Sequence, residues 1–548
     1  MNADAFSPVS LEIFRNALTA TAAEMDIAVW RTSRSTVVRE LLDYSTAVFD
    51  RNGYNVAQAA RIPGHLNSMG AGLLTIVTKH LPLDQWVEGD VVITNDPYCG
   101  GQHIPDILAF RPVFVDGERV AIVGTLCHHL DMGGMATGSY SATATEIVQE
   151  GLRIPPLKLV AGGEMDANVF AIMMNNVRRP DMLKGDLQAQ LASLAVGEAN
   201  VRRLALRVGI DVFIASCEKI LDQSETAMQA MLSRIPDGTY TFEDFLDDDG
   251  ISDDPIRIHV TLQVMGERIT VDLSGCSQQA KGPVNATLAS SLSAVTFALL
   301  SIADADISPN AGVMRPVTVI APQGLIVNAK HPAPVANRVA TTHRLATTIL
   351  GALHQAIPER VPAAYYGVSY VATFQTIADD GERGVLVEIE VGGSGAHHDA
   401  DGQSGYTYGM HNNSNIPIEM IESEMPLTVV AYGLLDGSGG AGRQRGGLGL
   451  FREWRIDSPE AMFSANGERF HFRPYGLDGG NPGREGHLTL IRGTERIPLG
   501  SKVNNLTLKR GDIIRLETSG GGGYGLPGDR KEAERRNDAL LRYTSESF

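Results

Sequence analysis

The chain has 548 residues, of which 43% are hydrophobic and 20% are charged, a composition typical of globular proteins and not of disordered ones. Its 46 basic and 64 acidic side chains give a formal net charge of −18, which argues against nucleic acid or a membrane surface as a partner. A chain of this length exceeds one ordinary hydrophobic core, so we expect two or more domains.

Targeting signals and cysteines point to a cytoplasmic protein. Residues 1–6 contain neither a basic residue nor an apolar stretch, so we expect no signal peptide. No run approaches the ~18 apolar residues that a membrane span needs. The four cysteines are widely spaced, form no CxxC pair and are too few for a disulfide scaffold.

The N-terminal part predicts one long helix followed by antiparallel hairpins. Ser7 can cap the helix and Pro8 suits its first turn, and apolar residues then recur at helical spacing. Two strand-like runs joined by a tight turn predict a hairpin over 45–59. A short β-branched strand is expected at 91–94, and an Asp-Gly turn between apolar runs predicts a second hairpin over 107–127.

The periodicity changes to helical over 181–232 and breaks at a Pro-Asp-Gly sequence just beyond. We therefore divide the chain into an N-terminal α+β domain (1–235), a mixed region with Gly-rich turns (236–528) and a charged C-terminal tail (529–548). Further regular elements are predicted as strands at 256–264 and 268–273 and helices at 286–302 and 340–356.

The second hairpin can bring potential metal ligands together. Asp106 and His128 are about equally far along the chain from the turn at Asp116-Gly117. They should therefore lie directly opposite each other on the two strands, or be displaced by one residue from that position. Opposed residues have Cβ atoms roughly 4.5–5.5 Å apart, close enough for both side chains to reach one ion at about 2.0–2.2 Å. His103 lies in the preceding loop and can turn onto the same ion. This set suits zinc, manganese or iron and does not distinguish them.

Other polar residues could support such a site. His129 should point to the opposite face of the strand from His128, and Asp131 could orient a ligand histidine. His65 could line the substrate pocket, or it could simply cap the following helix. Arg443 could bind a carboxylate or carboxyphosphate, or be a solvated or interface-paired turn residue.

The sequence contains no recognisable nucleotide-binding loop. There is no GxxxxGK[ST] run, and the Gly-rich runs near Gly393, Gly439 and Gly520 lack the following lysine. We interpret these runs as turns, although residues 520–523 could also form a nest of backbone N–H groups that binds an anion.

Several motifs, in the same order, resemble the hydantoinase B family. The similarity extends over nearly the whole chain, and ordered motifs are more specific than any one of them. The matching segments are Asn95-Asp96-Pro97-Tyr98, His103-x-x-Asp106, His128-His129-x-Asp131-x-Gly133-Gly134, residues 39–50, 281–286, 415–419, 439–447 and 520–525.

This resemblance implies a B-type subunit that pairs with an A-type subunit, which binds and cleaves ATP with Mg²⁺. Such pairs are N-methylhydantoinases, 5-oxoprolinases, lactamases such as caprolactamase, and acetone or acetophenone carboxylases. The resemblance also implies that His103, Asp106 and His128 are metal ligands with a catalytic role. A further ligand, Asp43, is implied by the resemblance alone. The expected class is α+β, with a hairpin-rich, metal-binding N-terminal domain followed by a larger mixed region.

Three functions follow as alternatives. The first is an ATP-dependent hydrolase of cyclic amides, acting as part of a hetero-oligomer on a small molecule. The second is a ketone carboxylase that uses bicarbonate, but acetone carboxylases of the family have a longer B-type chain, so the length favours the hydrolase. The third is a non-catalytic scaffold that only completes the partner's active site.

Overall fold

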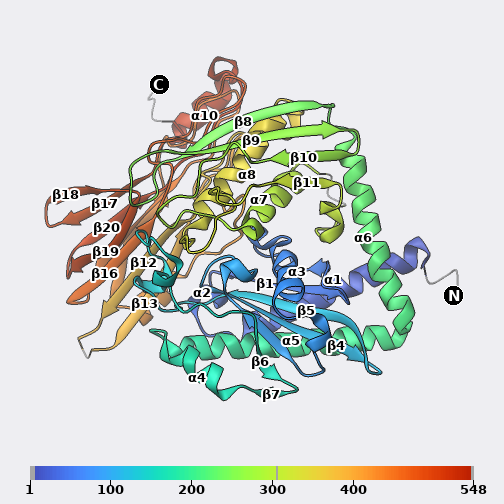
Figure 1. The fold of residues 1–548 in the computed structure, drawn as a ribbon. Coiled ribbons are helices and arrows are strands. Elements are labelled where there is room, and N and C mark those ends of the chain that lie inside the picture. Colours follow the sequence, from blue (N-terminus) through green and yellow to red (C-terminus); the bar gives the residue numbers. More distant parts are fainter. Residues whose placement is uncertain (1–5, 304–306, 380, 545–548) are drawn as a thin grey trace.

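A computed structural model describes residues 6–303, 307–379 and 381–544 (Figure 1). These residues combine helices with four β-sheets, so the predicted mixed class is confirmed. No helix in the described part of the chain is long and apolar enough to cross a membrane. The helices not introduced below with the sheets are α2 (Thr36–Arg39), α4 (Ala167–Asn175) and α9 (Ile418–Glu424).

A seven-stranded antiparallel sheet forms the N-terminal part, with the strand order β2-β1-β5-β4-β3-β6-β7. It contains both predicted hairpins and the predicted short strand. Its strands are β1 (Tyr44–Asp50), β2 (Asn55–Gln58), β3 (Val91–Thr94), β4 (Asp106–Val115), β5 (Glu118–His128), β6 (Leu157–Ala161) and β7 (Glu164–Met165).

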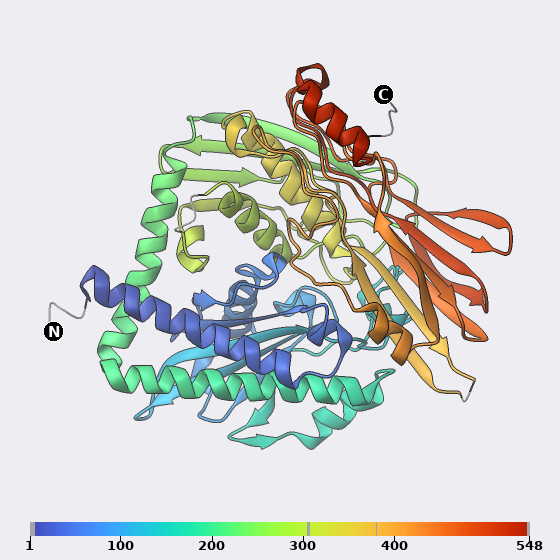
Figure 2. The same cartoon turned by 180° about the vertical axis from the view of Figure 1, so that it is seen from behind.

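Helices cover both faces of this sheet. On one face α1 (Pro8–Thr32) and α5 (Pro180–Val208) run close together, as Figure 2 shows, and Ser7 caps α1 by accepting a hydrogen bond from the backbone of Ser10. On the other face lies α3 (Ser68–Lys79). Successive residues of a strand point to opposite faces. Apolar side chains of β4 and β5 therefore pack alternately against the helices on one face of the sheet and against those on the other.

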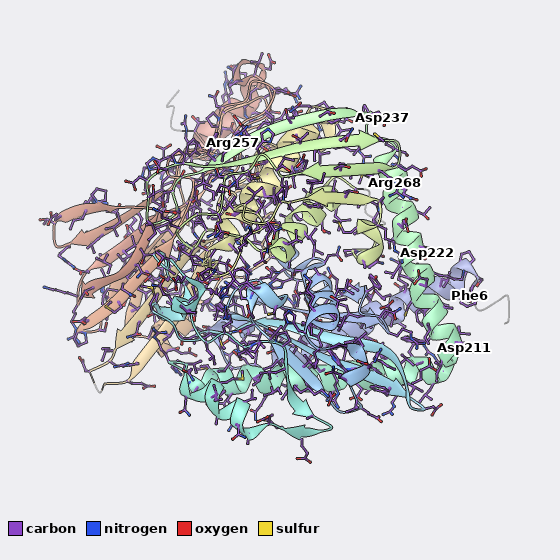
Figure 3. All side chains as sticks on the ribbon, in the orientation of Figure 1. Phe6, Asp211, Asp222, Asp237, Arg257 and Arg268 are labelled. Carbon is purple, nitrogen blue, oxygen red and sulfur yellow. The ribbon has the colours of Figure 1, made fainter. Side chains whose placement is uncertain are left out.

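The long helical stretch folds as two helices because Gly209 adopts a left-handed conformation (φ 89°) between them. The second, α6 (Ile210–Leu232), leads from the N-terminal sheet to the next part of the molecule. In Figure 3 Asp211, Asp222 and Asp237 mark this course, from the start of α6 to the start of the next sheet. The predicted boundary at residue 235 falls between α6 and the first strand of that sheet, β8 (Gly238–Leu246).

The middle part is a four-stranded sheet in the order β11-β10-β9-β8, with two helices packed on its inner face. Its helices are α7 (Leu288–Ser301) and α8 (Arg338–His354), and its strands are β8 (Gly238–Leu246), β9 (Ile256–Met265), β10 (Arg268–Asp272) and β11 (Val317–Ile320). Helix α8 is buried along nearly its whole length, although it carries two arginines and a histidine inside.

Two further sheets pack on each other in the C-terminal part, with Phe374, Trp454 and Phe463 at the centre of their core. One has the order β13-β12-β16-β19 and the other β14-β15-β20-β17-β18. Their strands are β12 (Tyr370–Ile377), β13 (Arg383–Glu390), β14 (Leu427–Leu434), β15 (Leu450–Ile456), β16 (Glu460–Asn466), β17 (His487–Arg492), β18 (Glu495–Leu499), β19 (Lys502–Lys509) and β20 (Ile513–Glu517).

The charged C-terminal segment includes a helix, α10 (Glu532–Leu540), that ion pairs hold against the rest of the chain. Arg530 contacts Asp538 at 2.6 Å and Asp401 at 2.8 Å.

The Gly-rich runs are for the most part not turns, which corrects the sequence-based interpretation. Residues 392–396, 444–448 and 519–524 are extended segments that lie side by side and exchange backbone hydrogen bonds, such as Gly447 N–H to Ser394 O at 2.9 Å, and the chain bends only at 439 and 442–443 within the middle run. At most of these glycines a Cβ atom would overlap the backbone of a neighbouring segment. Glycine is required here because no side chain fits between the segments.

This packing predicts a large difference between two glycine-to-alanine changes. In Gly521→Ala the new Cβ would overlap the Ser394 carbonyl. We therefore expect the free energy of unfolding to fall by at least ~2 kcal/mol, or the variant to give no soluble protein. In Gly528→Ala the Cβ meets no atom within 4 Å, and we expect a change below ~0.5 kcal/mol. Denaturant unfolding of both variants checks this, and equal stability would contradict the close packing.

Candidate metal and active site

The predicted register of the β4–β5 hairpin is confirmed, because Asp106 pairs directly with His128. His103 lies one tight turn before β4, where its carbonyl accepts a hydrogen bond from the Asp106 N–H at 3.1 Å. All three side chains are buried, and one potential ligand atom from each lies within 4.8 Å of the others. Residues far from the hairpin turn therefore meet because two antiparallel strands hold them opposite each other.

The facing atoms of this group have no hydrogen-bond partner. They are His103 Nε2, Asp106 Oδ1 and His128 Nδ1, all shielded from solvent. The first two lie 3.1 Å apart but do not form a well-directed hydrogen bond. A separation of about 3.0–3.5 Å is what two atoms show when both bind one ion at 2.0–2.2 Å. Unpaired buried polar atoms are costly, so these residues fit a divalent cation.

The remaining atoms of the three side chains are held from outside the group. His103 Nδ1 lies 3.3 Å from the Ala336 carbonyl, and His128 Nε2 lies 3.0 Å from the Tyr140 hydroxyl. Asp106 Oδ2 accepts a 2.8 Å bond from Arg338. Such contacts fix the ring tautomer and orientation of metal-binding histidines.

Electrostatics keep these groups in the protonation states that metal binding requires. Burial alone would raise the pKa of Asp106, but His103 and Arg338 outweigh it and hold that pKa far below its usual range. Burial lowers the pKa of both His103 and His128. At neutral pH the carboxylate is therefore ionised and the imidazoles are neutral.

The group lies at a buried cavity of about 40 Å³ between the N-terminal sheet, α8 and the C-terminal part. The cavity is lined by Asp43, Ile62, Gly64, His65, Gln102, His103, His128, Tyr140, Arg338, Val339, Thr342, His343, Ser369, Ile389, Met410, His411 and Asn413.

Asp43 and His65 both lie in this cavity wall. His65 Nδ1 contacts the Ser45 hydroxyl at 2.9 Å, and its Nε2 lies 3.9 Å from Asp43. Burial lowers the pKa of His65 to about 4, so its ring is neutral. Asp43 is outside the 4.8 Å group, and two atoms on one ion cannot be more than ~4.4 Å apart. The role of Asp43 as a further ligand therefore stays a prediction that rests on the family resemblance.

The other predicted supporting residues lie elsewhere. His129 points to the α5 side of the sheet, where its Nε2 donates to Gln190 at 3.0 Å. Both carboxylate oxygens of Asp131 bind backbone or Arg178 groups and neither contacts a histidine, which corrects the expected orienting role. Arg443 is exposed and donates to the His398 carbonyl, outside the cavity wall.

Sequence reasoning missed the residues that reach the cavity from distant parts of the chain. Arg338 and His343 come from α8, and His411 comes from a loop that precedes α9. The His343 and His411 rings are 4.3 Å apart between centroids. The sequence signal for these residues was the presence of charged and polar side chains in a predicted helix whose other residues are mostly small or apolar. Buried charges of this kind are usually paired or functional.

A larger cleft of about 1210 Å³ adjoins the cavity and shares part of its wall. It runs between α1, α6, α7 and the segment at 406–412, and Ile62, His65 and His411 line both spaces. These three residues therefore separate the candidate metal group from a volume large enough for a small organic molecule.

Comparison with known proteins identifies the family of this chain. The family described as hydantoinase B/oxoprolinase matches residues 7–527. The chain belongs to this family. A Pseudomonas sp. (strain NS671) protein, provisionally named as the B-type subunit of a D-/L-hydantoinase, is 31% identical over 97% of this chain and 92% of its own.

Two solved structures have the same fold. An ATP-dependent caprolactamase from Pseudomonas jessenii superposes with a TM-score of 0.92, at 30% identity, covering 98% of this chain and 94% of that one. An acetone carboxylase superposes with a TM-score of 0.91 but at 18% identity, over 99% of this chain and 78% of the other, and shows the fold alone.

Glu150 supports the site from a buried position. One of its carboxylate oxygens accepts the backbone N–H groups of Val335 and Ala336, each at 2.8 Å. It thereby holds the loop whose Ala336 carbonyl contacts His103. Burial raises the pKa of Glu150 to about 8.

This shift predicts a pH-dependent stability that Glu150→Gln removes. A carboxyl pKa raised on folding contributes stability below its unfolded value of about 4.3, and that contribution is lost as the pH rises through the folded value near 8. We expect the melting temperature of the variant, relative to that of the wild type, to be higher at about pH 8.5 than at about pH 5.5. A constant difference between the two melting temperatures across this range would contradict the raised pKa.

Proposed function

We propose that this chain is the B-type subunit of an ATP-dependent cyclic-amide hydrolase and works with an ATP-binding A-type subunit. The observation that carries the proposal is the buried convergence of His103, Asp106 and His128, whose facing atoms have no other partner. The likeness to a hydantoinase subunit and to a caprolactamase supports cyclic amides as the substrate class.

The three side chains would hold a divalent cation such as zinc, manganese or iron. When bound, such an ion would polarise a carbonyl or bicarbonate oxygen or lower the pKa of a water molecule. The chain itself keeps Asp106 ionised through Arg338 and keeps the histidines neutral through burial. It also excludes bulk water, because the ligand side chains are at most 2% exposed.

The Gly-rich segments of this chain are not free to bind a nucleotide, so we assign ATP and Mg²⁺ binding to the partner subunit. The N–H groups of residues 520–523 all donate to carbonyls of neighbouring segments, so they cannot cradle a phosphate. This removes the anion nest considered from sequence. Phosphorylation by the partner would supply the driving force for opening an unstrained amide.

The larger cleft is the place for the organic substrate. Its inner wall, formed by Ile62, His65 and His411, is also the wall of the metal cavity, so a ring bound there lies next to the candidate metal group. The cavity alone is too small for a ring of five or more heavy atoms.

A ketone carboxylase subunit remains the second candidate. The acetone carboxylase has the same fold, so the fold does not distinguish the two candidates, and a carboxylase would use the same cation with bicarbonate as a co-substrate. The chain covers a larger share of the caprolactamase than of the acetone carboxylase chain, which favours the hydrolase.

Metal content tests the site directly. In protein purified without chelators, mass spectrometry should find about one zinc, manganese or iron per wild-type chain and at least ~10-fold less in His103→Ala. The matched control is His80→Ala, an exposed histidine after α3, which should keep the metal. Metal-free wild type, or equal metal in all three proteins, would refute the site.

Activity tests the reaction. The chain, combined with an A-type subunit, should open hydantoin, 5-oxoproline or a lactam only with ATP, and His128→Ala should lower kcat by at least ~100-fold. A product heavier by one carboxyl group that appears only with bicarbonate would favour the carboxylase. Undiminished activity of the His128→Ala complex would favour the scaffold.

A further inference from the structure

Four nitrogen atoms in the cavity wall are buried and have no hydrogen-bond partner among the described residues. Two belong to His103 and His128, and the metal group accounts for them. The other two, Arg338 Nη1 and His343 Nε2, both come from α8. The proposed metal leaves this second pair unexplained, and buried polar atoms without partners require an explanation.

Arg338 lines the cavity and has one buried donor, Nη1, without a partner in the described part of the chain, while its other nitrogens hold it in place. Its Nε donates to Gln102 Oε1 at 3.1 Å, and its Nη2 donates to Asp106 Oδ2 at 2.8 Å. The guanidinium is planar and always charged, so these two bonds also fix the direction of Nη1.

His343 also presents a donor. Its Nδ1 lies 2.9 Å from the Tyr365 hydroxyl, and its Nε2 has no hydrogen-bond partner among the residues that the structure describes. In the tautomer in which the Tyr365 hydroxyl donates to Nδ1, the ring carries its hydrogen on Nε2, and Nε2 is then a donor. Burial lowers the pKa of His343 well below its ordinary value, so the ring is a neutral donor.

His343 does not belong to the metal group. Its nitrogens are outside the set of ligand atoms that lie within 4.8 Å of one another, a limit wider than the ~4.4 Å that two ligands of one ion can span. The two donors of α8 therefore serve a different occupant from the one that the hairpin serves.

The charges around the cavity indicate the sign of that occupant. Arg338 is positive, Asp106 is negative, and the His65, His343 and His411 rings are neutral because burial lowers their pKa values. Asp43 also lines the cavity and can contribute at most one further negative charge. A divalent cation would make the cavity net positive, and an anionic oxygen restores the balance.

We propose that Arg338 Nη1 and His343 Nε2 form an oxyanion-binding site that holds a negatively charged oxygen on the reacting carbon. The source of that oxygen is either a small carboxylate such as bicarbonate or the oxyanion that develops when an amide carbonyl is attacked. The inference deepens the proposed function and rests on it for the reaction, but the two donors belong to the chain whether or not metal is bound. A cavity of about 40 Å³ admits a group of this size and not a whole ring.

Formate is a suitable probe because it presents a carboxylate and little else. We would titrate carbon-13-labelled formate into the full-length chain after chelator treatment and measure binding from the NMR line width. Removing metal ensures that only the chain's own donors are tested. Saturable binding is expected for wild type and for His103→Ala, and its absence in wild type would overturn the proposal.

His343→Phe keeps the ring shape and removes the donor. We expect about 10- to 100-fold weaker formate binding, because a hydrogen bond to a charged group is lost. His343→Gln retains an N–H donor and should recover part of the affinity, even if the Phe variant folds poorly. The matched control is His354→Gln at the far end of the same helix, where the ring contacts Asp478 outside the cavity. Equal formate affinity in all variants would overturn the proposal.

Two further measurements separate the outcomes. Wild-type metal content in His343→Phe is expected, whereas metal loss would identify His343 as a ligand instead. In the complex with the A-type subunit, a lower kcat at unchanged KM points to the developing oxyanion, and a higher KM for bicarbonate points to the carboxylate. If wild type bound formate but no metal, the proposed function would fail while the oxyanion site stood.

Discussion

The ion pair between Asp106 and Arg338 joins the two halves of the site. Asp106 comes from the first strand of a local hairpin, and Arg338 begins a helix that belongs to another part of the molecule. A carboxylate buried this completely would be protonated without a compensating charge. Because Arg338 contributes to that charge, this contact links the position of α8 to the ionisation of a candidate metal ligand.

The same contact lies between two sides of a small cavity, one suited to a cation and the other to an anion. On the hairpin side, lone pairs of imidazole and carboxylate converge, which suits a cation. On the α8 side, Arg338 and His343 line the cavity with nitrogen atoms that have no partner within the described ranges, and in our proposal these donors hold an anion. Each side is fixed by hydrogen bonds that point away from the cavity, such as His103 to Ala336 and His343 to Tyr365. The site is therefore organised before any ligand enters, and little reorganisation is required on binding.

The sequence was sufficient for the hairpin half of the site and not for the other. The pairing of Asp106 with His128 follows from the position of a single turn, because register in an antiparallel hairpin is a local property. Arg338 and His343 are more than two hundred positions away, and only the tertiary fold brings them to the hairpin. Asp131 and Arg443 looked equally plausible from composition, yet hydrogen bonds to nearby groups occupy both. The domain boundaries inferred from periodicity stay predictions.

The Gly-rich segments were misread because a residue without a side chain leaves no periodic pattern. Their packing has a consequence for the order of events during biosynthesis. Two backbone hydrogen bonds of residues 392–396, donated by Gly393 and Ala396, go to Ser519 and Gly522, more than one hundred positions further along the chain. Until residues 519–525 have been synthesised, these donors lack their partners, and glycine is the residue with the most conformational freedom to lose. Closure of this part must therefore follow the synthesis of residues 519–525, since contacts between such distant segments form slowly. The N-terminal sheet, built mainly from neighbouring strands, can fold while synthesis continues.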